Sequence, residues 1–486
     1  MGIKGMKTTS GYLTVYLTLT ITVMLSLYLA LIEGARSNAI RLETECITDI
    51  GMNSVMAEYH RELYEQYNLF AIDTSYGTGQ AGKANVEKHL REYLDRNTSA
   101  KDIFMAGFFY KDFLAMSVKK LKLTKVSILT DDDGAVFRRR AVEAIKDDVG
   151  ISLMKDLAEW NKTVKDNQLN ERDIFAEKRE IDAEIQEYDG KSVLNDEGQW
   201  VTVEIENPTD ALEELRNKGA LQIVVEQPQS LSAKTISLEN LIGSRLETGE
   251  INKGNWQEQK ANKLDELTER FFFQEYLLKY MGRYGCVDEE NALSYQVEYL
   301  ISGKGSDLEN LRNTINTLCA VREVANAVYL FGDEEKCAVA ELLAVLLASL
   351  MMVPEISDLL KVTLLLGWAY AESLYDVEML LKGERIPLIK DDSSWHYDLD
   401  SALALSGVTK EVTSGLSYED YLRIFMSFTD LETLTIRAMN MVEADIRCTP
   451  GNQNFRLDAC YDCIEAQIFI KSAFGYEYEI TRQKKY

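Results

Sequence analysis

The sequence is poor in the residues and motifs on which most enzyme sites depend. Its 486 residues include 3 histidines and 5 prolines, and they contain no HExxH, GxSxG or GxxxxGK[ST] motif. Zinc proteases, serine hydrolases and P-loop nucleotide hydrolases therefore lack their characteristic residues. The scarcity of proline argues against a proline-rich stalk and leaves room for long helices.

Basic residues are also in deficit. The chain carries 79 acidic against 53 basic side chains, a formal net charge of −26, while 46% of its residues are hydrophobic. That apolar content is typical of an ordered globular protein. The acidic balance repels phosphate backbones, so we expect no nucleic-acid partner. We also predict no cofactor and no metal site.

An uncharged segment near the N-terminus sets the location of the protein. Residues Tyr12–Ile32 contain no charged side chain. As a helix they span roughly 30 Å, the thickness of the hydrocarbon core of a bilayer. Lys4 and Lys7 precede the segment and Glu33 follows it. Because positive residues favour the cytoplasm, we predict a single-pass anchor with a cytoplasmic N-terminus and an extracytoplasmic body.

A cleaved secretory signal is the competing interpretation. Such signals have a shorter apolar region, of about 7–15 residues, followed by a small-x-small site. Here the apolar stretch is longer and continues into Glu33 and Arg36 with helical sequence. A retained anchor is therefore favoured.

The rest of the chain predicts a predominantly helical α+β protein. The helical pattern continues past the anchor to Tyr67, which predicts one helix of about 84 Å from Tyr12. Beyond this stalk, strands are predicted at 69–72, 119–130, 200–205 and 221–225. Helices are predicted at 85–96, 135–147, 173–187, 271–281, 292–301, 307–331, 338–352, 359–380 and 418–441. The segment 338–353 is too short for a second span and contains Glu341, so we predict a buried core helix there.

These elements group into six regions. The predicted boundaries are a cytoplasmic leader at 1–11, a transmembrane helix at 12–33, an amphipathic stalk helix at 34–67, a mixed α/β region at 68–150, a polar inserted subdomain at 151–264 and a mainly helical domain at 265–486.

Few residues suggest chemistry. The run Asp131–Gly134 has carboxylates for calcium but not the ligand spacing of an EF-hand, and a solvated turn is favoured. Seven cysteines include Cys448, Cys460 and Cys463 close together in sequence. A disulfide from Cys448 to one of the other two is one interpretation, and buried or free thiols are the other. No residue is predicted to be catalytic.

Several stretches together resemble a family of Gram-positive membrane proteins associated with tight-adherence (Tad/Flp, type IV-like) pilus loci, the TadE/TadG-like pseudopilins. They are GYLTVYLTLTITVMLSLYLALIEGAR, AEYHRELYEQYNLFAIDTSYG, EYLISGKGSDLENLRNTINTL, REVANAVYL, GERIPLIK, LSYEDYLRIFMSF and IRAMNMVEADIR. The resemblance covers most of the chain, with 151–264 the least matched.

The resemblance implies a pseudopilin-like role among other pilin-like or pilus-assembly membrane proteins. It places prepilin-type cleavage after Gly11, before Tyr12, with Gly5 as a weaker site. Pilins carry a glutamate five residues into the mature helix, where this chain has Tyr16. Both a filament subunit and a non-polymerising assembly factor therefore stay open.

The leading hypothesis is a non-enzymatic, membrane-anchored structural or assembly component of such a pilus. The bilayer, through residues 12–33, and other pilus proteins are its expected partners. A membrane-tethered cell-surface binding module is the alternative. An anchored hydrolase is a third, because paired carboxylates are abundant but reveal no pocket in sequence.

Overall fold

The computed structural model describes residues 9–98, 114–148, 150–194, 198–225, 227–256, 266–404 and 414–486. The chain folds mostly into helices with a small sheet region, which confirms the predicted α+β class. Two compact units form. The first comprises Met1–Val136, Asn252–Gln259 and Asn454–Tyr486, and the second comprises Phe137–Ile251 and Lys260–Gln453.

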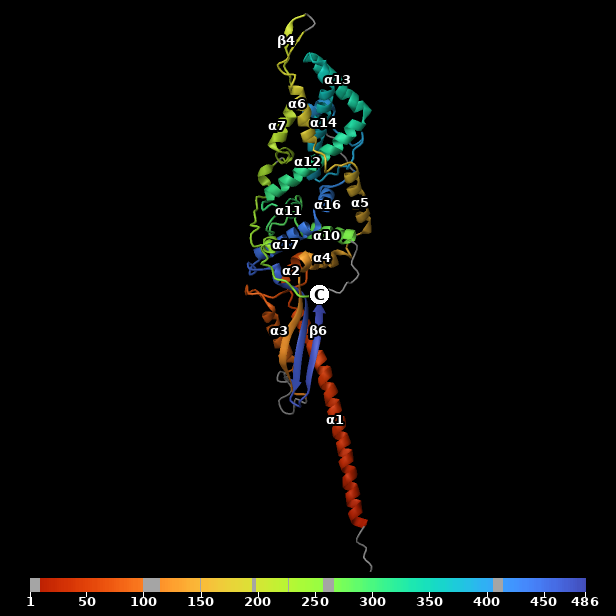
Figure 1. Cartoon of the computed structure of the whole chain (residues 1–486), viewed down its shortest axis with the longest axis vertical. Helices are drawn as coiled ribbons and strands as arrows, with labels where there is room; N and C mark the ends of the chain where they lie inside the picture. Colours follow the sequence, from red (N-terminus) through yellow and green to blue (C-terminus); the bar gives the residue numbers. More distant parts are fainter. Residues whose placement is uncertain are drawn as a thin grey trace, which may run out of the picture. The chain divides into compact units, whose positions relative to one another are not determined.

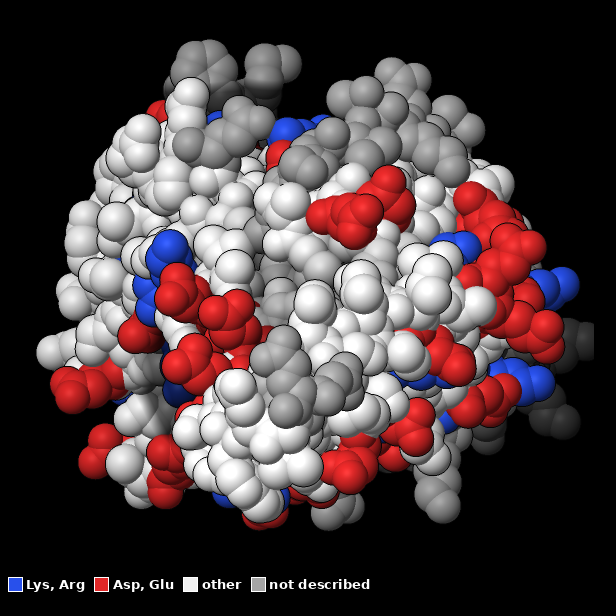
Figure 2. Space-filling model, turned by 90° about the horizontal axis from the view of Figure 1, so that it is seen from above, with Lys and Arg blue, Asp and Glu red and all other residues white. Residues whose placement is uncertain are grey.

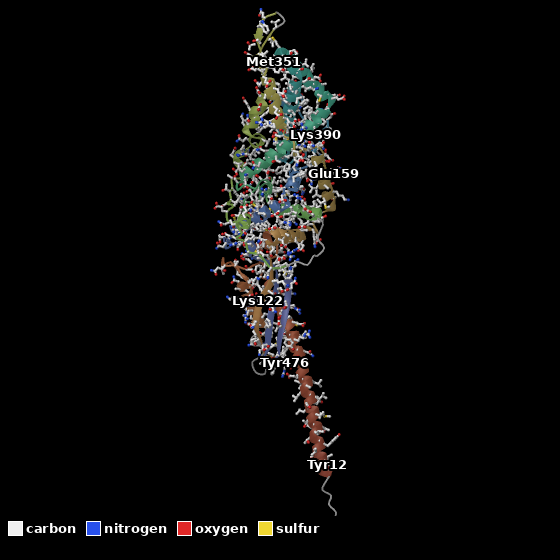
Figure 3. All side chains as sticks on the ribbon, in the orientation of Figure 1. Tyr12, Lys122, Glu159, Met351, Lys390 and Tyr476 are labelled. Atoms are coloured by element: carbon white, nitrogen blue, oxygen red, sulfur yellow. The ribbon has the colours of Figure 1, made fainter. Side chains whose placement is uncertain are left out.

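The first unit is built on a long N-terminal helix, α1 (Thr9–Met56) (Figure 1). Its apolar half, labelled at Tyr12 in Figure 3, is exposed to solvent except at the half-buried Thr20. Hydroxyl groups in this half donate back to helix carbonyls, as Thr18 does to Thr14 at 3.0 Å, so their polarity is satisfied within the helix. Within the described part of the chain, α1 is the one helix long and apolar enough to cross a bilayer. It is compatible with a single-pass anchor or a signal sequence.

The second half of α1 packs on an antiparallel sheet. Strand β5 (Cys460–Ser472) pairs with β1 (Ile72–Asp73), β2 (Met116–Ile128) and β6 (Glu477–Lys485). Helix α3 (Lys83–Thr98) contacts both α1 and β2. The core between these layers is apolar and includes Ile40, Ile47, Met52, Val55, Val86, Leu90, Leu94, Leu123, Val126, Ile464 and Ile468.

The predicted continuous helix to Tyr67 is wrong, because α1 ends at Met56. The next helix, α2 (Arg61–Tyr67), begins where the His60 side chain accepts a hydrogen bond from the amide of Leu63 at 3.2 Å. The amide of His60 itself donates to the carbonyl of Ala71 at 2.9 Å. This local capping interrupts a sequence whose apolar spacing continues unchanged.

In the described residues of the second unit the regular structure is helical apart from one hairpin, β3 (Ser192–Leu194) with β4 (Trp200–Thr202). Its long central helices, α12 (Asp307–Gly332) and α14 (Ser357–Leu381), pack against each other (Figure 1). Its other α-helices are α5 (Ile151–Asp166), α6 (Ile174–Gln186), α7 (Asp210–Lys218), α8 (Ala220–Val224), α9 (Ile242–Thr248), α10 (Glu266–Tyr280), α11 (Gln296–Ser302), α13 (Glu334–Leu350), α15 (Leu399–Ala404), α16 (Tyr418–Phe428) and α17 (Leu431–Cys448). Helix α4 (Asp131–Ile145) starts in the first unit.

Three further predictions need correction. The segment 221–225 is helical in α8, and 418–441 is divided into α16 and α17 by a new cap at Asp430. The chain after 460 forms strands β5 and β6, which the prediction of a mainly helical 265–486 region missed.

The residues of the predicted subdomain 151–264 lie almost entirely in the second unit, where α6 contacts α14.

Helix α13 differs most from its expected role as a buried core helix. Only its alanines Ala340, Ala344 and Ala348 are buried. Leu343 and Leu347 are half-buried, whereas Val339, Leu342, Val345, Leu346 and Leu350 are exposed, with Leu342 at 75% and Leu350 at 69%. The small face allows close approach to α14.

Candidate functional site

The most chemically suggestive cluster of the second unit is a buried group of charged residues. Arg322 of α12 donates through Nε to Oδ2 of Asp376 of α14 at 3.0 Å. The Lys390 ammonium, from the chain after α14 (Figure 3), contacts Glu372 and lies 2.5 Å from Oδ1 of Asp376. The Nδ1 atom of His396 lies 2.8 Å from Oε1 of Glu372. The side chains of these residues are almost entirely inaccessible to solvent.

Backbone and hydroxyl groups complete this network. Arg322 Nη1 donates to the carbonyls of Pro387 and Leu388, at 2.9 and 2.8 Å, and to the hydroxyl of Tyr421 at 3.0 Å. The second carboxylate oxygen of Glu372 accepts from the amide of Tyr397 at 3.0 Å. The network therefore fixes the irregular chain after α14 against α12, α14 and α16.

Glu372, Asp376 and His396 offer ligand atoms within 4.8 Å of one another, close enough for a metal ion. The Lys390 ammonium already contacts all three, lying 3.3 Å from His396 Nδ1. Two cations, Arg322 and Lys390, balance the two carboxylates. A divalent ion would bring further positive charge to buried carboxylates that already have cationic partners, which is costly. The geometry therefore favours an internal ion-pair network over a metal centre.

The electrostatics of Asp376 agree with this interpretation. Burial alone raises the pKa of a carboxyl group, but Lys390 and Arg322 hold the pKa of Asp376 below its ordinary value. Asp376 is therefore an ion-pair partner and not an acid poised to give up a proton near neutral pH.

A second buried carboxyl group behaves in the opposite way. Oε1 of Glu298, on α11, accepts from the amide of Tyr284 and from the hydroxyl of Tyr418, each at 2.9 Å. Among the described residues, its other oxygen has no hydrogen-bond partner. Burial raises the pKa of Glu298 to about 7. That pKa lies in the physiological range, and the hydrogen bonds of this carboxyl group are to Tyr284 and Tyr418 of the protein itself.

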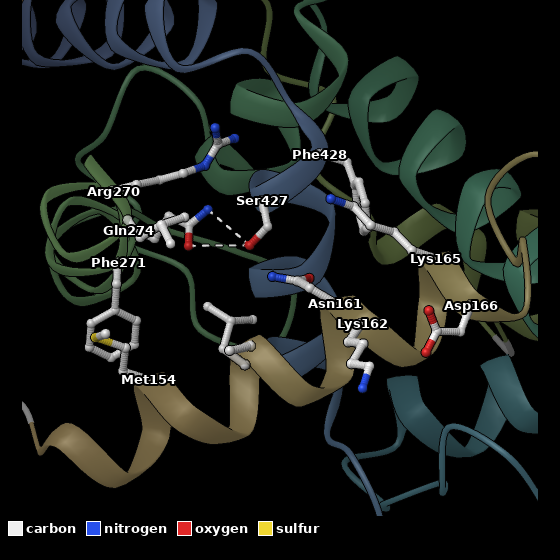
Figure 4. Close-up of a pocket in the computed structure, with 13 residues that line it drawn as sticks. Met154, Asn161, Lys162, Lys165, Asp166, Arg270, Phe271, Gln274, Ser427 and Phe428 are labelled. Carbon is white, nitrogen blue, oxygen red and sulfur yellow. Dashed lines mark hydrogen bonds between the residues drawn. The ribbon is translucent and has the colours of Figure 1, made fainter. Parts of the chain in front are cut away.

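An open cavity of about 500 Å³ lies between α5, α10 and α16 (Figure 4). Its lining is mixed. Apolar side chains, such as Phe271 and Phe428, alternate with Lys162, Lys165 and Arg270, while Asp166 supplies one carboxylate. Its volume is within the range of small-molecule sites. The Arg270 guanidinium donates to the carbonyls of Met426 and Thr429 at the end of α16, so it is engaged in capping that helix.

The first unit holds a third polar cluster. Glu58, just after α1, accepts from the hydroxyls of Tyr76 at 3.0 Å and Tyr93 at 2.8 Å, and lies 3.1 Å from His89 Nδ1. Tyr76 also stacks on the His89 ring at 3.9 Å. These contacts join the end of α1 to α3. The sequence did not predict the glutamate partners of His89 and His396.

The residues singled out in the sequence lie apart. Gly11 and Tyr12 are in the first turns of α1. Cys448 is exposed at the end of α17 in the second unit, whereas Cys460 and Cys463 are buried in β5 of the first. The disulfide stays a prediction. Asp131 of the acidic turn accepts from the amides of Ile128 and Gly254, each at 2.8 Å, which gives this aspartate a structural role without a cation.

Comparison with known proteins places the chain in a family. Residues 198–472 match the model described as "Family of unknown function (DUF5702)", which covers more than half of the chain. The chain belongs to the DUF5702 family. No curated protein and no solved structure matches it.

The DUF5702 match contains both buried networks of the second unit and strand β5. It excludes α1, α3, β1, β2 and β6, so the apolar helix and three of the four strands of the sheet lie outside the matched region. Three stretches that carry the pilus-locus resemblance, with Arg322, Lys390 and Tyr421, meet in the ion-pair network. These stretches therefore have a packing function in the second unit.

Proposed function

We propose that this DUF5702 protein is a single-pass, membrane-anchored and extracytoplasmic structural or assembly component of a Tad/Flp pilus, with a pseudopilin-like role. The observation that carries the proposal is α1. Its exposed apolar half continues without a break into a half that is packed in the core of the first unit. An apolar helix of this length finds a suitable environment in a bilayer or among other apolar helices.

The packed half favours an anchor over a cleaved signal. Ile40, Ile47 and Met52 are buried core residues of the same helix that carries the apolar segment. Cleavage of a signal sequence would cut this helix just before its packed residues. A retained helix instead joins the apolar segment directly to the first unit. The Lys4 and Lys7 charges support a cytoplasmic N-terminus and an exported body.

The polar clusters support a structural role. In the second unit an imidazole and two carboxylates resemble a metal or acid–base site. The carboxylates form ion pairs with Lys390 and Arg322, and Lys390 also contacts the imidazole. The Gly11–Tyr12 bond lies in the first turn of α1, where backbone amides lack helical partners and the helix frays most easily. That position supports access for a prepilin-type peptidase.

The deciding experiment is co-expression with a prepilin peptidase, followed by mass spectrometry of the mature N-terminus. We expect cleavage after Gly11, its loss in Gly11→Val, and unchanged cleavage in the matched control Gly34→Val. An intact N-terminus with and without the peptidase would reject processing and leave a plain anchor. Protease shaving of intact cells should degrade the chain beyond Glu33, and complete protection would reverse the proposed topology.

The cavity of the second unit favours one alternative, a membrane-tethered binding module. Its lysines and aromatic rings suit a small anion with an apolar body. The fluorescent anion 8-anilinonaphthalene-1-sulfonate is a direct probe. This alternative predicts that the double variant Lys162→Gln/Lys165→Gln binds the probe more weakly than the wild type, and that decanoate but not decanol displaces the probe. Equal binding of the probe to the wild type and to the double variant would reject it.

A further inference from the structure

The exposed side of α13 is an unusual surface for an acidic protein. Five large apolar side chains lie on it: Val339, Leu342, Val345, Leu346 and Leu350. In the face that Figure 2 shows, acidic side chains outnumber basic ones and stand in separate groups with uncharged surface between them. The α13 face thus gathers five neighbouring apolar side chains on a chain whose net charge is −26.

We propose that this α13 face is a self-association surface that packs against α13 of a second copy of the chain. The proposal goes beyond anchoring and does not depend on the pilus assignment. Exposed apolar area on these five side chains is on the order of 500 Å². That equals the largest patch on typical soluble monomers, about 300–600 Å², and approaches the roughly 800 Å² that each partner contributes to a stable interface.

The pattern on the helix is self-complementary. Leu342, Leu346 and Leu350 are spaced by four residues and form one continuous ridge. Beside it, Val345 and Ser349 form a lower row that leaves a groove. When two helices each insert an i±4 ridge into such a groove, they cross at about −50°, the commonest helix-packing arrangement. A two-fold axis near Leu346, the middle of the ridge, brings identical surfaces together.

The centre of the α13 face carries no charge that opposes this contact. Between Leu342 and Val353 the sequence has no charged residue. The nearest acid on the helix, Glu341, is paired with Lys361 of α14 at 2.8 Å. Lys336, one of the basic residues near the start of α13, is paired with Asp333 at 2.8 Å. Glu334 and Glu335 lie in the first turn of α13. At the expected crossing angle this end of the helix lies away from the α13 helix of the second copy.

The same charges make a lipid surface a poorer occupant. Interfacial helices combine an apolar face with Lys and Arg that attract anionic headgroups. The residues that flank the α13 face are instead mainly acidic, namely Glu334, Glu335, Glu341, Glu355 and Asp358. Copies anchored in one membrane are also held at a high effective concentration, which makes a patch of this size sufficient.

Cysteine cross-linking of the full chain in proteoliposomes tests the proposal. Leu346→Cys should form a disulfide-linked dimer at least ten times faster than Leu194→Cys, a matched control at which the native leucine is equally exposed, 59% against 56%. Both are read by non-reducing electrophoresis against the wild-type background of native cysteines. Adding Leu342→Glu to Leu346→Cys should lower the cross-linking rate to that of Leu194→Cys, because the two glutamates of a dimer would place like charges in the interface.

Equal cross-linking rates at positions 346 and 194 would overturn the proposal, and so would a Leu342→Glu variant that cross-links as before. Circular dichroism of each variant verifies folding, which these exposed positions should preserve. A second pair, Leu350→Cys with and without Leu342→Glu, gives an independent measurement. None of these outcomes depends on peptidase cleavage at Gly11, so failure of self-association and failure of the pilus proposal are distinguishable.

Discussion

Glu298 makes the second unit sensitive to pH in a direction that the structure predicts. The carboxyl group is completely buried, and burial raises its pKa from 4.5 to about 7. The folded protein therefore holds this proton more tightly than the unfolded chain does. The stabilisation is fully present below about pH 4.5, declines as the pH rises, and is lost above the folded pKa of about 7.

The size of the effect follows from linkage. With these two pKa values, the free energy of unfolding should fall by about 2.5 kcal/mol between pH 5 and pH 8 through this one group. Glu298→Gln carries no charge at any pH and retains an oxygen for the amide of Tyr284 and the hydroxyl of Tyr418. Its new N–H donors lack a partner, which costs about 1 kcal/mol. At pH 8 the variant should therefore be more stable than the wild type by roughly 1–2 kcal/mol, and at pH 5 it should be less stable.

Urea denaturation at a series of pH values, followed by tryptophan fluorescence, measures this difference. Trp368 and Trp395 are buried reporters in the second unit. Glu309→Gln is the matched control, since Glu309 is an exposed glutamate on α12, and it should keep the wild-type pH profile. A Glu298→Gln variant that retains the wild-type pH dependence would refute the reasoning, because the proton would then be held elsewhere.

Three further predictions concern buried contacts. Lys390→Met leaves a buried carboxylate without its cation and should cost about 3–5 kcal/mol in urea denaturation, whereas Lys361→Met, in an exposed pair, should cost less than about 1 kcal/mol. The wild-type cluster around Lys390 should give no micromolar site when Mn²⁺ is titrated and followed by electron paramagnetic resonance; such a site would contradict the ion-pair interpretation. Gly51→Val should destabilise the first unit by about 1–3 kcal/mol, because a Cβ at position 51 meets the Leu94 side chain at 2.8 Å. Limited proteolysis should cleave the first unit faster in this variant than in the control Gly34→Val, where no atom lies near the added Cβ.

The sequence predicted those elements whose patterns are long and local. Helices α12 and α14 have apolar residues at helical spacing over 25 residues or more, and the strand at β2 alternates clearly. Strand β5 was missed although its second half alternates, with Ile464, Ala466, Ile468 and Ile470 buried; its first half, Cys460–Cys463, is buried at every position and gives no alternation. Its pairing with β2 joins residues more than 330 positions apart, which no local pattern encodes.

The polar sites were beyond prediction for a related reason. Arg322, Asp376 and Lys390 look like ordinary surface charges when each is taken with its sequence neighbours. Only the packing of α12 on α14 shows that their side chains are completely buried. One signal was present, since Lys390 follows an apolar stretch and precedes Trp395 and His396, a combination typical of a buried segment more than of a solvated loop.

The two halves of α1 constrain one another. A helix whose second half is held in a packed core cannot rotate its first half independently, because backbone hydrogen bonds run without interruption from Thr9 to Met56. The apolar half alone would allow any orientation in a bilayer. In this chain the rotation of the apolar half about the helix axis is fixed, because Ile40 and Ile47 of the same helix point into the core of the first unit. Gly51 strengthens this coupling, since the absence of a side chain lets α3 approach closely at Leu94 and Leu90. A movement of the apolar half is therefore passed to the first unit through one continuous helix.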